Sequence, residues 1–572
     1  MIDYTISCAN RSSQIAQISI FTQVTDLNDS LEFGLPAWRP GRYELQTYAR
    51  NIFDVKAFGP ENQPLHTCKT DRNSWQILNP VKGLVTITYQ YSCVQLDAGG
   101  SWIDDILVYI NPINCLLYLK EHDHLPCQLT LDFHDTIEQT ASNLVFKNKT
   151  AQAENYFRLA DSPFFISKQQ GHERYEINGV TFHIWTHGLI GFSLTKDFEA
   201  FTKVQLKAME HFPEKEYHFL LLLFPFRHYH GVEHHQSTVI TFGPTQEFGD
   251  TSLYEELISI SSHELYHAWN ICKIRPREMY PYRLQQENYF RTGFVAEGIT
   301  TYLGEYFLRQ SGFFSEERFL LEIEQWFNRH RMHRGFQRAS LADSSFDLWV
   351  DGYIGSSTDY KVSIYVAGAL AAIALDLHIR LANKDKSLFD LMRTLYQEKA
   401  LRFEGYTESY LQNEIHTLIG GKEEKQFWNK CITGHSVDSY ATEALEQFGI
   451  SVRSVSSNYC HERILGIKLK PSHSKLEVAK LHAGSPSSHC FMAEDLLVAV
   501  NDVPVHTLEE LQAALELSSH PQFSVLRKGR TITFSIPIKD GHDYWITTSV
   551  QKNSDASDEQ KLRYNDWMKM LS

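Results

Sequence analysis

The amino-acid sequence predicts a multidomain protein of the α+β class. Its 572 residues correspond to about three to five domains of ordinary size. Short runs that alternate apolar and polar residues dominate the first 165 residues, and longer stretches with helical periodicity dominate from about 166 to 450. Alternating runs return from about 463 to 538 around one helical segment, Thr507–Leu517. These changes of period predict three domains that differ in secondary structure.

The first predicted domain, residues 1–165, is an antiparallel β-domain. In Ile15–Ile20 and Leu84–Tyr89 the apolar residues occupy every second position, and turn residues separate such runs. Successive side chains of a strand point to opposite faces, so this period predicts strands with one buried face.

The second predicted domain, residues 166–450, is the largest and consists mainly of helices. The apolar run Leu220–Phe224 predicts a buried strand, and an edge strand beside the first helix would let extended peptides pair through backbone hydrogen bonds. Ser252 and Glu255 have the spacing of a capping box at the start of that helix. Amphipathic periodicity predicts five helices, near Leu253–Trp269, Phe294–Arg309, Glu316–Phe327, Val362–Arg380 and Leu388–Glu398.

Charge, hydropathy and cysteine content argue against several classes of protein. The 54 basic and 69 acidic residues give a formal charge of −15 without a long Lys/Arg run, so we expect no nucleic-acid partner. The longest apolar run, Ile364–Leu375, is too short to cross a bilayer, and the N-terminus has no signal-peptide pattern. Nine cysteines without a Cys-x-x-Cys pair favour a reducing compartment and argue against a cysteine metal site. We therefore expect a soluble cytoplasmic protein without a membrane partner, in which His and carboxylate side chains hold any metal.

The predicted helix at Leu253–Trp269 contains the motif His263-Glu264-Leu265-Tyr266-His267. Side chains four residues apart lie on one face of a helix, so His263 and His267 can bind the same zinc ion. Glu264 is rotated by about 100° from His263 and can reach a water molecule on the metal instead. The motif therefore predicts a metal site with a carboxylate base beside it.

A second predicted helix supplies a candidate third ligand. Glu297 lies among apolar residues, where a buried carboxylate needs a positively charged partner. Two histidines and one glutamate leave a fourth position for water, as in catalytic rather than structural zinc sites. We therefore expect one catalytic Zn²⁺ ion on His263, His267 and Glu297.

These residues belong to a longer series of motifs. His-Glu-x-x-His-x-Trp-Asn at 263–270 is followed by Ile274-Arg275-Pro276, Glu287-Asn288-Tyr289 and Glu297-Gly298-x-Thr300-x-Tyr302, and Leu35–Tyr43 contains Pro-x-Trp-x-Pro-Gly-x-Tyr. The series resembles the glycyl aminopeptidase family of zinc metallopeptidases, relatives of aminopeptidase N with a C-terminal PDZ domain. The resemblance implies a thermolysin-like catalytic domain with a helical extension at 166–450, a PDZ domain at 455–545 and a C-terminal tail at 546–572. The charged segment Gln551–Gln560 of this tail is expected to be a loose linker.

The resemblance also implies roles for individual residues. Glu297 matches the third zinc ligand of the family, whereas the rival Glu287 is nearer to the spacing in aminopeptidase N. Gly231 and Glu233 match a loop whose glutamate binds the free amine of the substrate. Charge favours this role, because a carboxylate beside the metal can hold an ammonium group.

Tyr365 matches the tyrosine that donates a hydrogen bond to the oxyanion, in a motif where this chain has Ala367 in place of the usual lysine. Tyr353 and Tyr360 are close enough in sequence to compete for this role. The hydroxyl of Thr301 could orient a ligand histidine. Four histidines are expected to lie in the loop around the site without forming a second metal site, namely His228, His230, His234 and His235.

The implied activity is that of a zinc-dependent aminopeptidase, which removes small residues such as Gly or Ala from peptides with a free N-terminus. Glu264 would take a proton from water and give it to the leaving amine, and Tyr365 would stabilise the oxyanion. One alternative is a catalytically weak protein that binds peptides in the PDZ groove and keeps zinc for structure, for which the departure at Ala367 is the cue. Another is an endopeptidase on the same site, which requires that Glu233 leaves the N-terminal side open. The PDZ groove itself could receive a peptide or pack against the protein's own chain.

Overall fold

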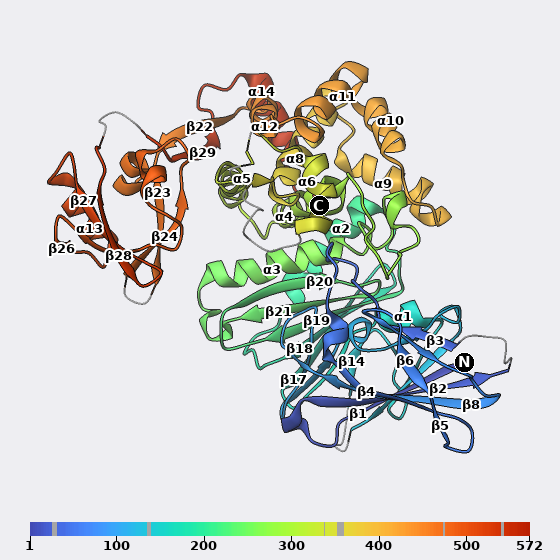
Figure 1. Ribbon diagram of the computed structural model, residues 1–572. Helices are drawn as coiled ribbons and strands as arrows, with labels where there is room; N and C mark the ends of the chain where they lie inside the picture. The colour runs from blue at the N-terminus through green and yellow to red at the C-terminus, as the bar shows by residue number, and fades with distance from the viewer. Residues whose placement is uncertain are drawn as a thin grey trace. The chain divides into compact units, whose positions relative to one another are not determined.

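The structure is a computed structural model that describes residues 1–25, 31–133, 139–333, 335–336, 338–351, 360–472, 475–538 and 543–571. It contains two compact units. The larger comprises Met1–Phe319, Gln337–Ala444 and Asn565–Ser572, and the smaller comprises Leu320–Phe336 and Leu445–Tyr564. Most of the smaller unit is therefore inserted in the sequence between two segments of the larger one. Figure 1 shows the elements of both units, coloured along the chain.

The larger unit begins with a β-rich domain, as the alternating runs predict. Its elements are β1 (Ile2–Ser7), η1 (Arg11–Ser13), β2 (Ile15–Val24), β3 (Leu31–Gly34), η2 (Tyr48–Asn51), β4 (Ile52–Phe58), β5 (Pro64–Leu65), β6 (Thr67–Lys69), β7 (Ser74–Ile77), β8 (Gly83–Ser92), β9 (Val94–Gln95), β10 (Ser101–Ile103), β11 (Leu107–Ile110), η3 (Pro112–Asn114), β12 (Tyr118–Leu119), β13 (Cys127–Asp132), β14 (Ala141–Ser142), β15 (Thr150–Ala153), α1 (Tyr156–Ala160) and β16 (Phe164–Ser167). Within the described residues the strands form three sheets, ordered β15-β13-β1-β2-β8-β4-β5, β14-β16-β11-β10-β9 and β12-β3-β7-β6. The two strands read from the alternating runs, β2 and β8, pair antiparallel along their length. β1 and β13 pair in parallel, which the long connection between them allows, so the domain is not antiparallel throughout.

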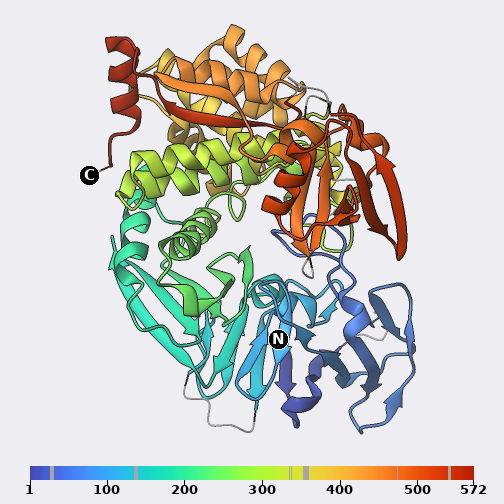
Figure 2. The same cartoon turned by 90° about the vertical axis from the view of Figure 1, so that its left-hand side faces the viewer.

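A mixed sheet follows the β-rich domain and lies beside it in Figures 1 and 2. Its elements are β17 (Gln170–Ile177), β18 (Val180–His187), α2 (Thr195–Met209), β19 (Glu216–Leu223), β20 (His228–Glu233) and β21 (Ser237–Gly243). The strand order within the described residues is β17-β18-β19-β21-β20. β19 is the predicted buried strand, and every residue after Glu216 in it is buried. The expectation of mainly helical structure from residue 166 is wrong up to residue 243, because polar residues in β17 and β18 obscure the period of two. β20 ends the sheet and pairs antiparallel with β21.

The five predicted helices are all present: four lie in the larger unit, and most of the helix Glu316–Arg331 lies in the smaller one. They are α3 (Thr251–Tyr266), α4 (Thr300–Ser311) with the π-helical turn η6 (Phe294–Ile299) before it, α5 (Glu316–Arg331), α8 (Val366–Ala382) and α9 (Leu388–Glu398). α3 packs on the edge of the mixed sheet formed by β20 and β21, as Figure 1 shows. The predicted capping box is wrong: Asp250 caps α3 by accepting a hydrogen bond from the Ser252 backbone N–H, so the helix starts before Ser252. The remaining elements of this part are η4 (Thr245–Glu247), η5 (Arg277–Met279), α6 (Leu341–Phe346), α7 (Leu348–Asp351), η8 (Ala400–Arg402), α10 (Glu408–Ile419), α11 (Gly421–Phe427), η9 (Trp428–Ile432) and α12 (Val437–Glu446).

The smaller unit contains the returning strands and the helix predicted near Thr507–Leu517. Its elements are β22 (Ile450–Ser456), η10 (His461–Leu465), β23 (Ile467–Ser472), β24 (Lys475–Leu481), η11 (Pro486–His489), β25 (Leu496–Val500), β26 (Val503–Pro504), α13 (Leu508–Glu516), β27 (Gln522–Arg527), β28 (Arg530–Ser535) and β29 (Ile546–Lys552). Within the described residues one sheet has the order β23-β24-β25-β27-β28, with β26 paired to β25, and β22 pairs with β29. Thr507 and Glu510 form a capping box at the start of α13.

The C-terminal segment is ordered, so the expectation of a loose linker is wrong. Residues of the expected linker lie in β29 and in α14 (Asp558–Trp567). The Trp567 side chain is fully buried in the larger unit, where its indole N–H donates to the Tyr302 hydroxyl (3.2 Å). The linker was inferred from the polar residues before position 560, whereas the apolar anchor that orders the segment follows them. A short polar stretch does not predict disorder when a buried tryptophan comes next.

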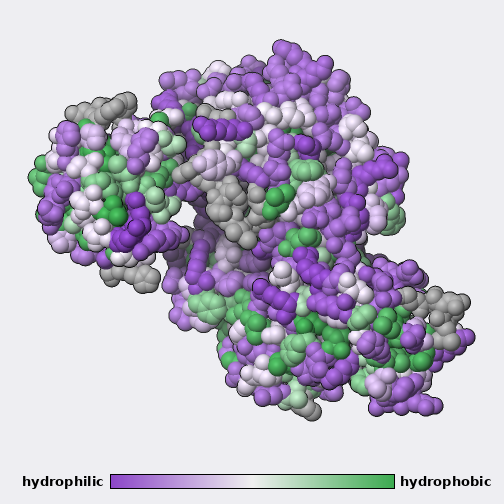
Figure 3. Space-filling view, in the orientation of Figure 1, coloured by the Kyte–Doolittle hydropathy of each residue, from purple (hydrophilic) through white to green (hydrophobic). Residues whose placement is uncertain are grey.

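No helix in the described part of the chain is long and apolar enough to cross a membrane. None of the nine cysteines, all of which lie among the described residues, forms a disulfide. On the face drawn in Figure 3, hydrophilic residues cover most of the helical part of the larger unit.

Candidate metal centre and active site

α3 brings the two histidines of the motif together at its C-terminal end. The Nε2 atoms of His263 and His267 lie 3.0 Å apart, so both rings direct a nitrogen at one position. His267 follows the last residue of the helix, and its Nδ1–H donates to the carbonyl of Asn270 (2.6 Å). This hydrogen bond fixes the tautomer in which the Nε2 lone pair is free to bind a metal.

The π-helical turn η6 carries Glu297 to the same position. Glu297 Oε2 lies 3.8 Å from His263 Nε2 and 3.5 Å from His267 Nε2, and the side chain is almost fully buried. The extra residue in a π-helical turn changes the direction of its side chains, and such turns are frequent at functional sites. A Cβ at Gly298 would lie 2.4 Å from Gly368 Cα, so two glycines let η6 and α8 touch. This close approach brings Tyr365, at the start of α8, near Glu297.

Two tyrosines hold the Glu297 carboxylate. The Tyr43 hydroxyl donates to Glu297 Oε1 over 2.8 Å, and the Tyr365 hydroxyl also hydrogen-bonds this carboxylate. Tyr365 is therefore in the centre, as the resemblance implies, but it contacts a metal-ligand candidate in the structure. Tyr43 was not recognised as a site residue, because it lies in another domain 254 residues away. Its place in the Pro-x-Trp-x-Pro-Gly-x-Tyr motif was the only sequence signal.

The donor set fits a zinc ion. One oxygen and two nitrogens from His263, His267 and Glu297 lie within 4.8 Å of one another, and they are ligand types that zinc prefers. Burial, and then the neighbouring His267, lower the pKa of His263 well below its ordinary value, which keeps the ring neutral for metal binding. Three protein ligands leave a coordination position for water or substrate.

Glu264 lies beside this cluster with its carboxylate buried. Oxygens of Glu233 and Glu264 lie within 4.8 Å of each other and of a His267 nitrogen. The pKa of Glu264 is raised, first by burial and then by the Glu233 and Glu297 carboxylates, against the opposing effect of His267. A carboxyl group with a raised pKa is suited to exchange protons near neutral pH.

Gly231 and Glu233 lie on the edge strand β20 next to Glu264. A Cβ at Gly231 would lie 2.2 Å from Glu264 Oε1, so only glycine leaves room for that carboxylate. Glu233 is 4% exposed, and its Oε1 has no hydrogen-bond partner among the described residues. An unpaired buried carboxylate oxygen is costly unless a ligand satisfies it.

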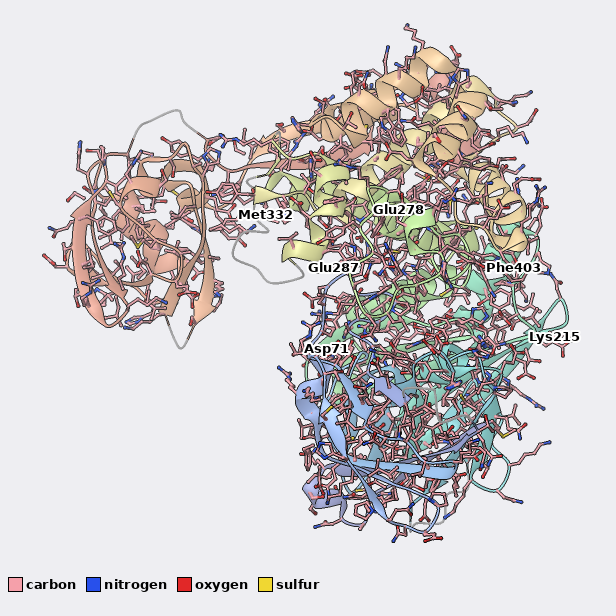
Figure 4. The ribbon with its side chains drawn as sticks, turned by 45° about the vertical axis from the view of Figure 1, so that its right-hand side comes forward. Asp71, Lys215, Glu278, Glu287, Met332 and Phe403 are labelled. Carbon is pink, nitrogen blue, oxygen red and sulfur yellow. The ribbon has the colours of Figure 1, made fainter. Side chains whose placement is uncertain are left out.

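The other sequence candidates lie outside this cluster. Glu287, labelled in Figure 4, is half-buried in the loop between η5 and η6 and does not join the three ligand atoms. Tyr360 is 54% exposed, and Tyr353 lies outside the described residues. The Thr301 hydroxyl makes no hydrogen bond within the described part of the chain, and the carbonyl of Asn270 orients His267 instead.

The upstream histidines contact residues outside the metal cluster. His228 Nε2 lies 3.2 Å from the carbonyl of Leu96, His230 lies 3.6 Å from Asp97, and His234 Nδ1 lies 2.8 Å from Asp161. These three partners belong to the β-rich domain. His235 pairs with Glu214 (2.7 Å). The histidines therefore join the mixed sheet to its surroundings.

A further group of ligand types lies on the mixed sheet. Atoms of His183, Glu216 and His218 lie within 4.8 Å of one another. The Trp185 indole N–H donates to His218 Nδ1 (3.1 Å), so neutral His218 carries its proton on Nε2. In this tautomer the nitrogen that faces Glu216 carries a proton and cannot bind a metal. Because the rings of His183 and His218 stack, the group is better described as a stacked histidine cluster.

Comparisons with known proteins agree with this arrangement. Residues 3–168 match the family model described as Peptidase M61 N-terminal domain, and residues 256–371 match the model described as M61 glycyl aminopeptidase. Each segment is therefore similar to one part of an M61 peptidase. The second match contains the His263, His267 and Glu297 cluster and Tyr365, and the first contains Tyr43. None of the curated proteins compared matches the chain.

One solved structure has the same fold over nearly the whole chain. A crystal structure of an aminopeptidase N family protein from Idiomarina loihiensis superposes with a TM-score of 0.90 at 22% identity, covering 99% of this chain and 100% of that one. An M1 zinc metallopeptidase from Deinococcus radiodurans, solved with a Tyr-Ser-Ala substrate, gives a TM-score of 0.47 at 13% identity, with 76% and 93% coverage.

Proposed function

We propose that this chain is a zinc-dependent aminopeptidase that removes small N-terminal residues from peptides. The observation that carries the proposal is the convergence of His263, His267 and Glu297 on one position, with Glu264 and Glu233 buried beside it. The match of residues 256–371 to the M61 glycyl aminopeptidase model supports both the peptidase activity and the preference for small residues.

The three ligand residues provide the metal chemistry. His263, His267 and Glu297 would hold a zinc ion, which would supply a Lewis acid for the peptide carbonyl and lower the pKa of water towards neutrality. Asn270 and Tyr43 hold His267 and Glu297 in place through hydrogen bonds.

Glu264 is the proton carrier in this proposal. Its carboxylate takes the proton of the attacking water and returns it to the nitrogen of the leaving amine. The position of Glu264 beside the ligand cluster supports the role, since a proton carrier must lie within reach of the water and of the leaving nitrogen. Gly231 keeps the space that the carboxylate needs.

Glu233 binds the free amine of the substrate, which makes the enzyme an aminopeptidase. Its buried Oε1, which has no hydrogen-bond partner in the described part of the chain, can accept a hydrogen bond from an ammonium group. Such charge-assisted bonds are among the strongest in proteins. When substrate is bound, the Tyr365 hydroxyl leaves Glu297 and donates a hydrogen bond to the oxyanion, since one hydroxyl cannot donate to both.

The amine role is tested with glycyl and alanyl anilides that have a free or an acetylated N-terminus. Wild type should cleave only the free-amine substrates, and Glu233→Gln should raise KM for these by at least about 10-fold, the equivalent of one charge-assisted hydrogen bond. Glu247→Gln, the same chemical change at an exposed position, is the control. If wild type cleaves acetylated and free-amine substrates equally, the aminopeptidase proposal is wrong and the chain is better described as an endopeptidase.

We also propose that the sheet β23-β24-β25-β27-β28 and α13 form a PDZ-type domain that binds an extended peptide. The terminal position of β23 supports this, because a terminal strand can accept another strand on its outer edge. Fluorescence polarisation with peptides that end in a carboxylate tests the proposal. Amidation of the C-terminus should abolish binding, and equal binding of the amidated peptides would contradict a PDZ mode.

A further inference from the structure

We propose that Tyr43, from the N-terminal β-rich domain, is a positioning residue for the metal ligand Glu297. The inference deepens the proposed function and rests on it for the identity of the metal. It makes the β-rich domain a structural part of the metal centre rather than an appended module.

The two oxygens of Glu297 have different partners. Oε1 accepts the Tyr43 hydrogen bond (2.8 Å), whereas Oε2 faces His263 Nε2 and His267 Nε2 at 3.8 and 3.5 Å. The Tyr43 side chain is 1% exposed, so water does not compete for this bond. Tyr43 therefore keeps one oxygen away from the metal position and leaves the other to bind as a single ligand atom.

The loop that carries Tyr43 is fixed to the catalytic part of the chain. The Trp38 indole N–H donates to the carbonyl of Arg283 (2.8 Å), and the Ala37 N–H donates to the carbonyl of Leu284 (2.7 Å). The Trp38 ring packs edge-to-face on Trp349 (5.1 Å between centroids). These contacts fix the loop at Ala37 and Trp38 and so restrain the position of Tyr43.

The aromatic ring of Tyr43 is held as firmly as its hydroxyl. The ring packs at a steep angle on Phe290 (5.3 Å) and Trp349 (6.3 Å). Removing only the oxygen therefore leaves a ring that stays in place, and Tyr43→Phe isolates the hydrogen bond.

The same loop also borders the proposed amine site. Gly41 has φ +78°, and a Cβ there would lie 2.2 Å from Glu233 Oε2. Two residues of one loop thus contact the third metal-ligand candidate and the amine-binding candidate. These two contacts indicate that the β-rich domain helps to assemble the site. A domain that only packed against the catalytic part of the chain would not contact both residues.

The experiment compares wild type, Tyr43→Phe and Tyr4→Phe. Tyr4 is the control because it is equally buried in the same domain and its hydroxyl donates to the backbone carbonyl of Leu117 (3.1 Å), away from the metal. Loss of a hydrogen bond that orients a metal ligand typically weakens metal binding about 10-fold to 100-fold. We expect this increase in the zinc dissociation constant, measured by chelator competition, for Tyr43→Phe and not for Tyr4→Phe.

Cobalt substitution and kinetics provide the second readout. Of the two tyrosines, only Tyr365 still donates to the Glu297 carboxylate in Tyr43→Phe. The carboxylate is then freer to bind through both oxygens, and the visible bands of Co²⁺ should weaken as the coordination number of the metal rises. At saturating zinc, kcat should fall while KM stays within about 3-fold, since Tyr43 contacts a ligand and not the substrate. Trp38→Phe keeps the Tyr43 hydroxyl but loosens the loop that carries it. This variant should also increase the zinc dissociation constant, by less than Tyr43→Phe does.

The outcomes separate this inference from the proposed function. Unchanged zinc affinity and an unchanged Co²⁺ spectrum in Tyr43→Phe would overturn the inference, even if the wild type is an active peptidase. A wild type that binds zinc but hydrolyses no peptide would overturn the proposed function, while the metal readouts still decide the role of Tyr43. If Tyr43→Phe does not fold, Trp38→Phe decides: wild-type zinc affinity in it would contradict the inference.

Discussion

Gly231→Ala tests whether Glu264 must occupy its observed position. A Cβ at residue 231 would lie 2.2 Å from Glu264 Oε1 and 2.7 Å from its Cδ, where ordinary contact begins at 3.4 Å. The carboxylate must therefore move by about 1 Å, and a misplacement of this size at a reacting group costs about 100-fold in rate. We expect kcat/KM for glycyl anilides to fall by about this factor, with zinc content unchanged.

The design includes a matched control and a compensating variant. Gly191→Ala is the control, because a Cβ there meets no atom of the described residues within 4 Å. In a Glu264→Asp background the shorter side chain leaves room for the new methyl group, so Gly231→Ala should cost much less there than in the wild type. An additive double mutant, or full activity in Gly231→Ala with its melting temperature unchanged, would refute the argument that Gly231 exists to make room for Glu264.

Two further predictions concern stability. Trp567→Ala should lower the free energy of unfolding, measured by urea denaturation, by about 3–5 kcal/mol, because a fully buried indole is removed. The control is Leu562→Ala in the same helix, which should lower it by less than about 0.5 kcal/mol because the Leu562 side chain is 70% exposed. Equal losses of stability in the two variants would contradict the burial of Trp567 in the larger unit. Burial, and then His183 and His172, lower the pKa of His218 to about 3 from its ordinary 6.5. The unfolded chain therefore binds a proton that the folded protein does not, and stability falls as the pH drops below about 6.5; His218 accounts for about 2 kcal/mol of this loss at pH 5. In His218→Gln the loss between pH 7 and pH 5 should be smaller by about that amount, and an unchanged loss would show that His218 can be protonated in the fold.

The metal centre could be predicted from sequence where the contacts are local. His263, Glu264 and His267 are set by the pitch of one helix, so their spacing alone places two imidazoles on one face. Glu297 was found because a carboxylate among apolar residues is unusual, although the π-helical turn that directs it left no pattern. The prediction of Glu297 as a ligand thus depended on the chemistry of a buried carboxylate, whereas the prediction of His263 and His267 depended on helix geometry.

The contacts made by distant segments were not predictable in the same way. Tyr43 and Glu297 are 254 residues apart. The alternation of apolar and polar residues identifies the strands of the first domain, but it does not indicate which helix of the second domain a loop between them contacts. Trp567 is a similar case, because it is buried against Tyr302 from the far end of the chain. The strands β17 and β18 were missed for a local reason, since their polar residues obscure the alternation that identifies a strand.

The most direct test of the metallopeptidase proposal measures zinc content and hydrolysis together, in wild type and Glu264→Gln. Both proteins should hold one zinc ion per chain. Wild type should hydrolyse free-amine glycyl and alanyl anilides, a chelator should abolish this activity and added Zn²⁺ should restore it. Glu264→Gln should lose about 100-fold to 10,000-fold in kcat, the usual contribution of a positioned proton carrier. Activity that survives zinc removal, or a Glu264→Gln variant as active as wild type, would contradict the account.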